Sequence, residues 1–174
     1  MSQLSRALFS HFFRICRLQD GPQDLPAAVL LRNTALLSYL LLSIVTSALN
    51  MPLGQALIAA AVDVTLLITL TSFLLSLRGL SARITQTLTA LAGTSVILSL
   101  FSIPMLIWLH MARSGQGDAA IPSLIMLALV IWNLLIIAHI FKHALSTLFA
   151  AGLLLAVGYF WLQLVILNAL LPTL

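Results

Sequence analysis

Five long apolar stretches fill most of this chain, and short polar turns separate them. They run over residues 33–50, 52–77, 84–111, 121–141 and 144–171. A helix needs about 20 apolar residues to cross the hydrocarbon core of a bilayer. Lipid admits only helices and closed barrels, and the period-two alternation of barrel strands is absent. The sequence therefore predicts an all-α, polytopic integral membrane bundle of five transmembrane helices.

Few charged residues are available to cover a surface that faces water. Of the 174 residues, 61% are hydrophobic and 7% are charged, whereas soluble domains carry about 25% charged residues. A soluble domain of this size would leave much of its apolar surface in water. We therefore divide the chain into a cytoplasmic N-terminal segment, residues 1–32, and a five-span transmembrane domain, residues 33–174.

The basic residues alternate between the two sides of the predicted bundle. Seven of the eight lysines and arginines lie in the N-terminal segment, in the connection 78–83 or at Lys142, which share one side. Arg113 alone lies on the other side. Because short basic loops stay in the cytoplasm, the N-terminus is predicted to be cytoplasmic and the C-terminus outside. The scattered charges suit anionic lipid and form no dense patch for nucleic acid.

The N-terminal segment has the pattern of an amphipathic helix. On a helical wheel the apolar face consists of Leu4, Leu8, Phe12 and Ile15. The opposite, basic face carries Arg6, Arg14 and Arg17. A helix of this kind lies along a membrane surface. We therefore expect the three arginines to contact lipid headgroups on the inner leaflet. An alternative is that the apolar face docks a partner protein.

Short polar motifs recur at the ends and inside the spans. They are Gln23-Asp24-Leu25-Pro26 before the first span, Asn50-Met51-Pro52 after it, Arg78-Gly79, Trp132-Asn133, Ala138-His139 and Lys142-His143-Ala144. With this pattern, residues 20–172 resemble the Yip-domain family, the five-span membrane proteins named for Rab/Ypt-GTPase interaction. The resemblance implies the same topology, with a cytosolic N-terminus and a C-terminus on the far side.

The length of the N-terminal segment makes the chain similar to the short bacterial members of that family. Eukaryotic members have a longer cytosolic N-terminal region than residues 1–32. Bacterial hosts lack Rab-driven vesicle traffic, so GTPase binding is not carried over. The resemblance implies a non-enzymatic protein of the bacterial inner membrane.

Asp63 is an acidic residue inside a predicted span. A carboxyl at a helix centre disfavours insertion by about 2.5–3.5 kcal/mol, which the neighbouring leucines offset, so Asp63 should face the bundle interior. It lies about 11 residues, roughly 16 Å, from the turn after the first span. Depth counted from that side predicts an intramembrane polar cluster of Asp63 with Asn133, Trp132, Gln163 and Tyr159, near Ser43, Thr46 and Ser47.

Three interpretations of this cluster remain open. In the first, a neutral Asp63 carboxyl forms hydrogen bonds with Asn133, Trp132 or Tyr159 and locks the helices together. In the second, Asp63 couples to the passage of a proton or an ion. In the third, it contacts lipid or a partner.

Motifs for metal binding or catalysis are weak in this sequence. His139 and His143 are spaced to share one helical face, but no acidic or cysteine residue accompanies them nearby. We expect interfacial histidines, with no metal and no cofactor. Phosphate loops, zinc-protease signatures and nucleophile–base arrangements are absent from the sequence, so we predict that the protein is not an enzyme.

These observations favour a scaffold or assembly factor that binds membrane lipids and other membrane proteins or itself. Small residues at helical spacing, such as Gly152 and Ala156, allow close packing of helices in lipid. The alternative is a small proton- or solute-coupled transporter or channel that uses Asp63 with Asn133 and Gln163. No inverted repeat is visible, and five spans do not divide into equal halves, which speaks against the alternative.

Overall fold

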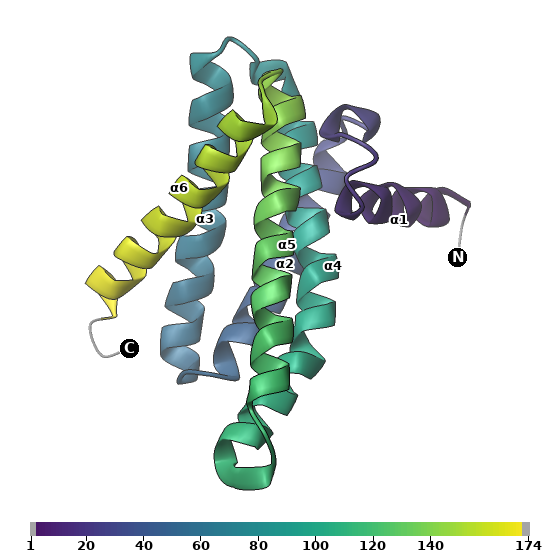
Figure 1. Ribbon diagram of the computed structural model, residues 1–174. Coiled ribbons are helices and arrows are strands. Elements are labelled where there is room, and N and C mark those ends of the chain that lie inside the picture. The colour runs from purple at the N-terminus through teal and green to yellow at the C-terminus, as the bar shows by residue number, and fades with distance from the viewer. Residues whose placement is uncertain (1–2, 172–174) are drawn as a thin grey trace.

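Five long helices make up most of the protein, and Figure 1 shows their arrangement. The computed structural model describes the backbone of residues 3–171 and the side chains of residues 8–115 and 117–171. Its helices are α1 (Gln3–Cys16), α2 (Val29–Ala48), α3 (Leu53–Leu77), α4 (Ile84–Met111), α5 (Ala120–Leu145) and α6 (Phe149–Leu170). Each helix from α2 to α6 is long and apolar enough to cross a membrane, and the described residues contain no β-strand. The predicted all-α, five-helix membrane bundle is confirmed.

Several helix ends differ from the sequence prediction. α2 begins at Val29, so Arg32 lies in its first turn and not in the preceding segment. α5 continues past Phe141 because Lys142 and His143 occupy its last turn, where basic groups interact favourably with the helix dipole. Ser146 ends this helix in the left-handed conformation, with a φ of 51°, and α6 begins only at Phe149.

α4 is the central helix of the bundle. It contacts α1, α2, α3 and α5, and α5 packs against α6. Where α5 and α6 meet, a Cβ atom on Gly152 would lie 2.2 Å from the carbonyl oxygen of Ala138. Gly152 and Ala156 are both buried, so small residues allow this close approach. Beyond it, α6 slants away from α5 and contacts α3 (Figure 1).

The connections divide between two ends of the bundle. We call one the basic end, because it holds the α3–α4 connection with Arg78 and Arg83 and the α5–α6 turn beside Lys142. The opposite end holds the α2–α3 turn and the α4–α5 connection with Arg113. Between the ends, large apolar side chains cover the outside of every long helix. Such an exterior requires lipid as its solvent, and the chain is an integral membrane protein.

α1 packs across the side of the bundle near the basic end (Figure 1). If Gly93 in α4 carried a Cβ atom, that atom would lie 2.2 Å from the ring of Phe12. Ile15 is fully buried. Part of the apolar face that we expected to meet lipid or a separate partner is therefore covered by the bundle itself. Phe9 and Phe13, on the adjacent side of α1, are exposed in its place.

Candidate functional site

Asp63 lies inside the bundle, near the middle of α3. It is ten residues from Leu53, or about 15 Å along the helix from the opposite end, and 6% of its surface is exposed. Ala59 and Ala60, one turn earlier, are buried as well. Small side chains let neighbouring helices approach, so this carboxyl is shielded from lipid.

Hydroxyl groups from two other helices surround the Asp63 carboxyl. The Tyr159 hydroxyl, from α6, donates to Oδ1 at 2.7 Å. The Tyr39 hydroxyl, from α2, donates to Oδ2. Ser43, one turn after Tyr39, is also within reach of Oδ2, at 3.4 Å. One carboxyl thus joins α2, α3 and α6 through side-chain hydrogen bonds.

Within the described part of the chain, no lysine or arginine forms an ion pair with Asp63. A buried polar group is unfavourable in lipid unless it is hydrogen-bonded. The two tyrosine hydroxyls meet this need, so the Asp63 carboxyl stabilises the packing of the helices that carry them.

A polar cavity of about 280 Å³ lies next to Asp63. Side chains from all five long helices form its wall, and the polar ones besides Tyr39 and Asp63 are Ser43, Thr46, Ser47, Ser95, Ser99, Ser102, Asn133 and Gln163. Apolar side chains of α4 and α5 complete the wall. A cavity of this size and polarity can hold water molecules or the polar group of a ligand.

The cavity reaches from Asp63 toward the opposite end. Ser47, in its wall, lies one residue from the last residue of α2 at that end. On the other side of Tyr159, toward the basic end, apolar side chains leave a gap of only about 10 Å³. Leu67, Leu91 and Phe141 line that gap. The cavity is therefore open on one side of Asp63 and closed on the other.

The structure brings most of the predicted cluster together. Tyr159 contacts the Asp63 carboxyl, and Asn133 and Gln163 line the same cavity. Trp132 does not join them, because its side chain is 43% exposed on the outside of α5. Trp132 points about 100° away from Asn133 around the helix axis, which here turns its side chain outward. The predicted place of Trp132 in the cluster is wrong.

Tyr39 was missed from the sequence, although it contacts Asp63 directly. It lies nine residues from the end of α2, and Asp63 lies ten residues from the start of α3. Because a tight turn joins these two helices, equal counts from the turn mean equal depth. Tyr39 also precedes Ser43 by four residues, which places both side chains on one face. These two signals were sufficient to find it.

Polar contacts attach the linker after α1 both to α1 and to α5 near the basic end. The Asp20 carboxylate accepts from Arg14 Nη2 at 3.0 Å and lies 3.0 Å from His11 Nδ1. The backbone carbonyl of Asp20 lies 3.1 Å from His139 Nε2 in α5. His139 in turn stacks edge-on against His143, with ring centroids 4.5 Å apart. These contacts hold the linker and α1 against α5.

The three arginines expected at the lipid surface differ in their surroundings. Arg14 and Arg17 are both exposed, but Arg14 also forms an ion pair with Asp20. The side chain of Arg6 lies outside the described residues. Cys16, at the end of α1, is buried, and this burial raises the pKa of its thiol to about 11. Within the described residues, no group of three or more His, Cys, Asp or Glu is placed to hold a metal ion.

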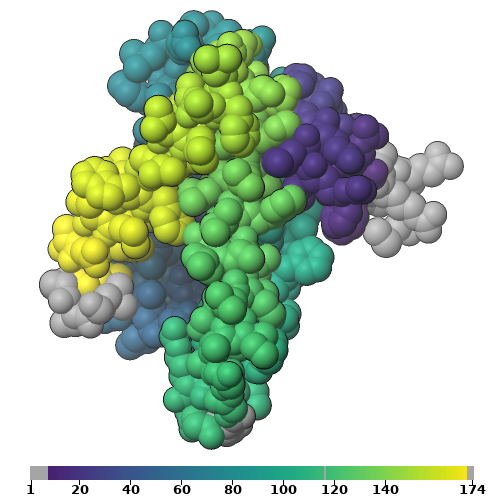
Figure 2. Space-filling view, viewed as in Figure 1, coloured from purple at the N-terminus to yellow at the C-terminus, as the bar shows by residue number. Residues whose placement is uncertain are grey.

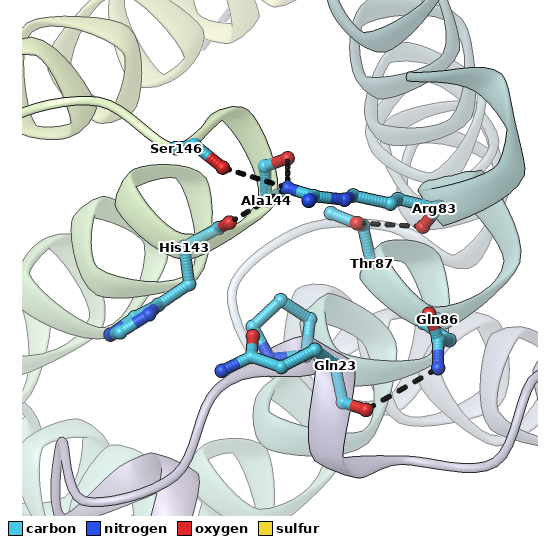
Figure 3. Close-up of a pocket in the computed structure, with 8 residues that line it drawn as sticks. Gln23, Arg83, Gln86, Thr87, His143, Ala144 and Ser146 are labelled. Atoms are coloured by element: carbon cyan, nitrogen blue, oxygen red, sulfur yellow. Dashed lines mark hydrogen bonds between the residues drawn. The ribbon is translucent and has the colours of Figure 1, made fainter.

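A second pocket, of about 250 Å³, lies at the basic end (Figure 3). Arg83 reaches across it from the residue just before α4, and its Nη1 donates to the Ala144 carbonyl at 3.0 Å and to Ser146 Oγ at 2.9 Å. On the far side, Gln86 Nε2 donates to the Leu25 carbonyl at 2.7 Å. The basic end of α4 is thus tied both to the α5–α6 turn and to the linker before α2.

Comparisons with known proteins supply no relative from which a role could be transferred. No protein-family model, no curated protein and no solved structure matches this chain. Its function must therefore be inferred from its own residues and their geometry.

Proposed function

We propose that the protein is a non-enzymatic membrane scaffold that binds a polar group of another membrane component in the cavity beside Asp63. The observation that carries this proposal is the cavity itself, about 280 Å³ of polar-lined space inside an apolar bundle. In lipid, a hydrogen-bonding wall attracts a partner that can satisfy it. Asn133 and Gln163 offer side-chain amides that both donate and accept hydrogen bonds.

The shape of the bundle supports access from the membrane. α6 diverges from α5 toward the opposite end (Figure 1), and the space-filling view has a recess between these helices with α3 behind it (Figure 2). A transmembrane segment of a partner, or of a second copy, could lie in this recess and place one polar side chain in the cavity. Helix pairs in membranes associate through such contacts.

The proposal includes an orientation. The basic end faces the cytoplasm, because seven of the eight lysines and arginines are associated with it and short basic loops are retained there. The cavity then opens toward the outer side of the membrane. We propose the bacterial inner membrane as the location, in line with the resemblance of residues 20–172 to short Yip-domain proteins. A reporter fused after Leu174 tests the orientation, since cytoplasmic activity of the reporter would contradict it.

Site-specific photocrosslinking in the intact membrane tests the scaffold function. A photoreactive amino acid at Met126, which lines the cavity, should give one discrete adduct. The same amino acid at Leu124, which is exposed on the outside of α5, should not give that adduct. Asn133→Leu should remove the adduct formed at Met126, whereas Trp132→Leu should retain it. Adducts of equal yield from positions 124 and 126 would contradict the proposal.

A second candidate function, a proton- or solute-coupled transporter, is favoured by one observation. Asp63 sits where the polar cavity meets the apolar closure formed by Leu67, Leu91 and Phe141. A carboxyl at such a boundary could exchange a proton with one side and then the other. Proton or solute flux from the isolated protein in liposomes, lost in Asp63→Asn, would favour this function over the scaffold. Absence of flux together with the Met126 adduct would favour the scaffold.

A further inference from the structure

An apolar groove of about 390 Å³ runs between α3 and α6 at the basic end. Most of its wall consists of aliphatic side chains from the end of α3, the end of α5 and the start of α6, which are Leu74, Leu77, Leu145, Ala151, Leu154 and Leu155. Leu77 and Leu154 are more than two-thirds exposed, so the groove is open to the surrounding lipid. Only two lining residues are polar, Arg78 and Thr147.

Arg78 differs from the other arginine of the same connection. Arg83 uses its Nη1 for the Ala144 carbonyl and Ser146 Oγ on one side of the α5–α6 turn (Figure 3). Arg78 lies by the groove on the other side, and its side chain has no hydrogen bond or ion pair with any residue that the structure describes. Its guanidinium group is exposed and available to an anion. Nor does any of the four acidic residues line the groove to neutralise it.

Thr147 supplies a second, independent sign of a missing partner. Its Oγ1 is buried and has no hydrogen-bond partner among the described residues. An unpaired buried hydroxyl is unfavourable, and most such groups in proteins find a partner. Thr147 itself is one of the residues that line the groove. The groove thus combines an apolar channel with the unpaired side chain of Arg78 and the unpaired hydroxyl of Thr147.

We propose that this groove binds an anionic phospholipid. One acyl chain lies along the leucines, and the phosphate is held by Arg78 and the Thr147 hydroxyl. Arginine binds phosphate through paired N–H donors, and basic pockets between membrane helices recognise anionic headgroups. The site is separate from the Asp63 cavity and does not depend on the function proposed for it.

Native mass spectrometry of the full chain in mild detergent tests the proposal. Phosphatidylglycerol, which is anionic, should remain bound more tightly than phosphatidylcholine of the same chain length. Arg78→Ala should weaken phosphatidylglycerol binding about fivefold, the ratio for one surface arginine, and Arg78→Lys should retain most of it. Arg113→Ala is the matched control, since it removes an exposed arginine from the opposite end and should change nothing.

Two further variants test the phosphate contact and the acyl-chain contact. Thr147→Val should weaken phosphatidylglycerol and phosphatidylcholine alike, because both lipids carry the phosphate that this hydroxyl would hold. Leu154→Trp, at an exposed position on the groove, should fill the channel and weaken both lipids. Unchanged phosphatidylglycerol binding in Arg78→Ala would overturn the proposal, as would an equal loss in Arg113→Ala. Displacement of the lipid by millimolar inorganic phosphate would also overturn it, because the site would then recognise free phosphate.

Discussion

The two halves of the bundle are packed differently. Next to the basic end, buried residues follow one another without a break over 87–94 in α4 and 136–141 in α5. Toward the opposite end, α4 after Ile97 buries only Leu109, and α5 before Ile136 buries only Pro122. The first half is close-packed, and the second is open around the polar cavity.

The difference follows from which residues each half contains. In the close-packed half, the missing side chain of Gly93 leaves room for the ring of Phe12. The missing side chain of Gly152 leaves room for the backbone of α5. In the open half, serines on α2 and α4 line a space that no side chain fills. A cavity lined by hydroxyls can keep water, whereas an apolar one stays dry. The close-packed core and the polar cavity thus lie in different halves.

The largest expected effect comes from breaking the close-packed half. In Gly152→Ala the new Cβ would meet the Ala138 carbonyl oxygen, a backbone atom that cannot move aside easily. Overpacking against a fixed neighbour lowers the free energy of unfolding by about 2–3 kcal/mol. Reversible unfolding in mixed detergent measures the loss. Gly158→Ala is the matched control, because no atom lies within 4 Å of its Cβ position, and a similar loss in both variants would contradict the packing argument.

The next largest effect should come from the boundary between the halves. Asp63→Ala leaves the hydroxyls of Tyr39 and Tyr159 without their acceptor, which should lower the free energy of unfolding by about 2 kcal/mol. Ser43→Ala removes only a 3.4 Å contact and should lower it by about 0.5 kcal/mol. The same unfolding assay compares the two. Equal stability of Asp63→Ala and the wild type would mean that the carboxyl does not join α2, α3 and α6.

A smaller loss is expected at the basic end itself. Arg83→Ala removes the charged hydrogen bonds to Ala144 and Ser146, and the free energy of unfolding should fall by about 1.5 kcal/mol. Arg78→Ala should change it by less than about 0.5 kcal/mol, because an exposed side chain without partners contributes little. If the two variants lost equal stability, Arg83 would not serve as the tie between α4 and the α5–α6 turn.

The last prediction is a pH dependence in the contact of α1 with the bundle, which is confined to alkaline solution and leaves the stability at neutral pH unchanged. Burial raises the pKa of the Cys16 thiol from its ordinary value of 9.0 to about 11. Below about pH 9 the thiol is neutral in the folded and unfolded chains, so its contribution is complete. Between about pH 9 and 11 only the unfolded chain releases the proton, and stability therefore falls as the pH rises. In Cys16→Ala the part of the fall in stability that this thiol causes between about pH 9 and 11 should disappear. An unchanged dependence of stability on pH would contradict the raised pKa of Cys16.

The spans could be predicted because hydropathy depends on consecutive residues. The third span was expected and found over 84–111, where charged or turn-forming residues adjoin both ends. The end of α5 could not be located in this way, since Lys142 and His143 look like a loop and only the left-handed Ser146 ends the helix.

The cluster around Asp63 could be predicted in part. Depth along each helix selected Tyr159, Asn133 and Gln163, but depth alone does not give the face, which is why Trp132 was included. The contact between the Asp20 carbonyl and His139 joins residues 119 positions apart. No periodicity in the sequence reports such a contact, because it depends on how the linker crosses the finished bundle.

The polar bridge at Asp63 has a consequence for the order in which the helices assemble. Tyr39 and Asp63 belong to adjacent helices joined by a short turn, so their bond can form as soon as this first pair has entered the membrane. Tyr159 lies in α6, and its hydroxyl can arrive only after α4 and α5 have been synthesised. Until then Oδ1 of the carboxyl lacks this donor, so a nascent chain that stalls before α6 would expose an unsatisfied acid to lipid and to membrane quality control.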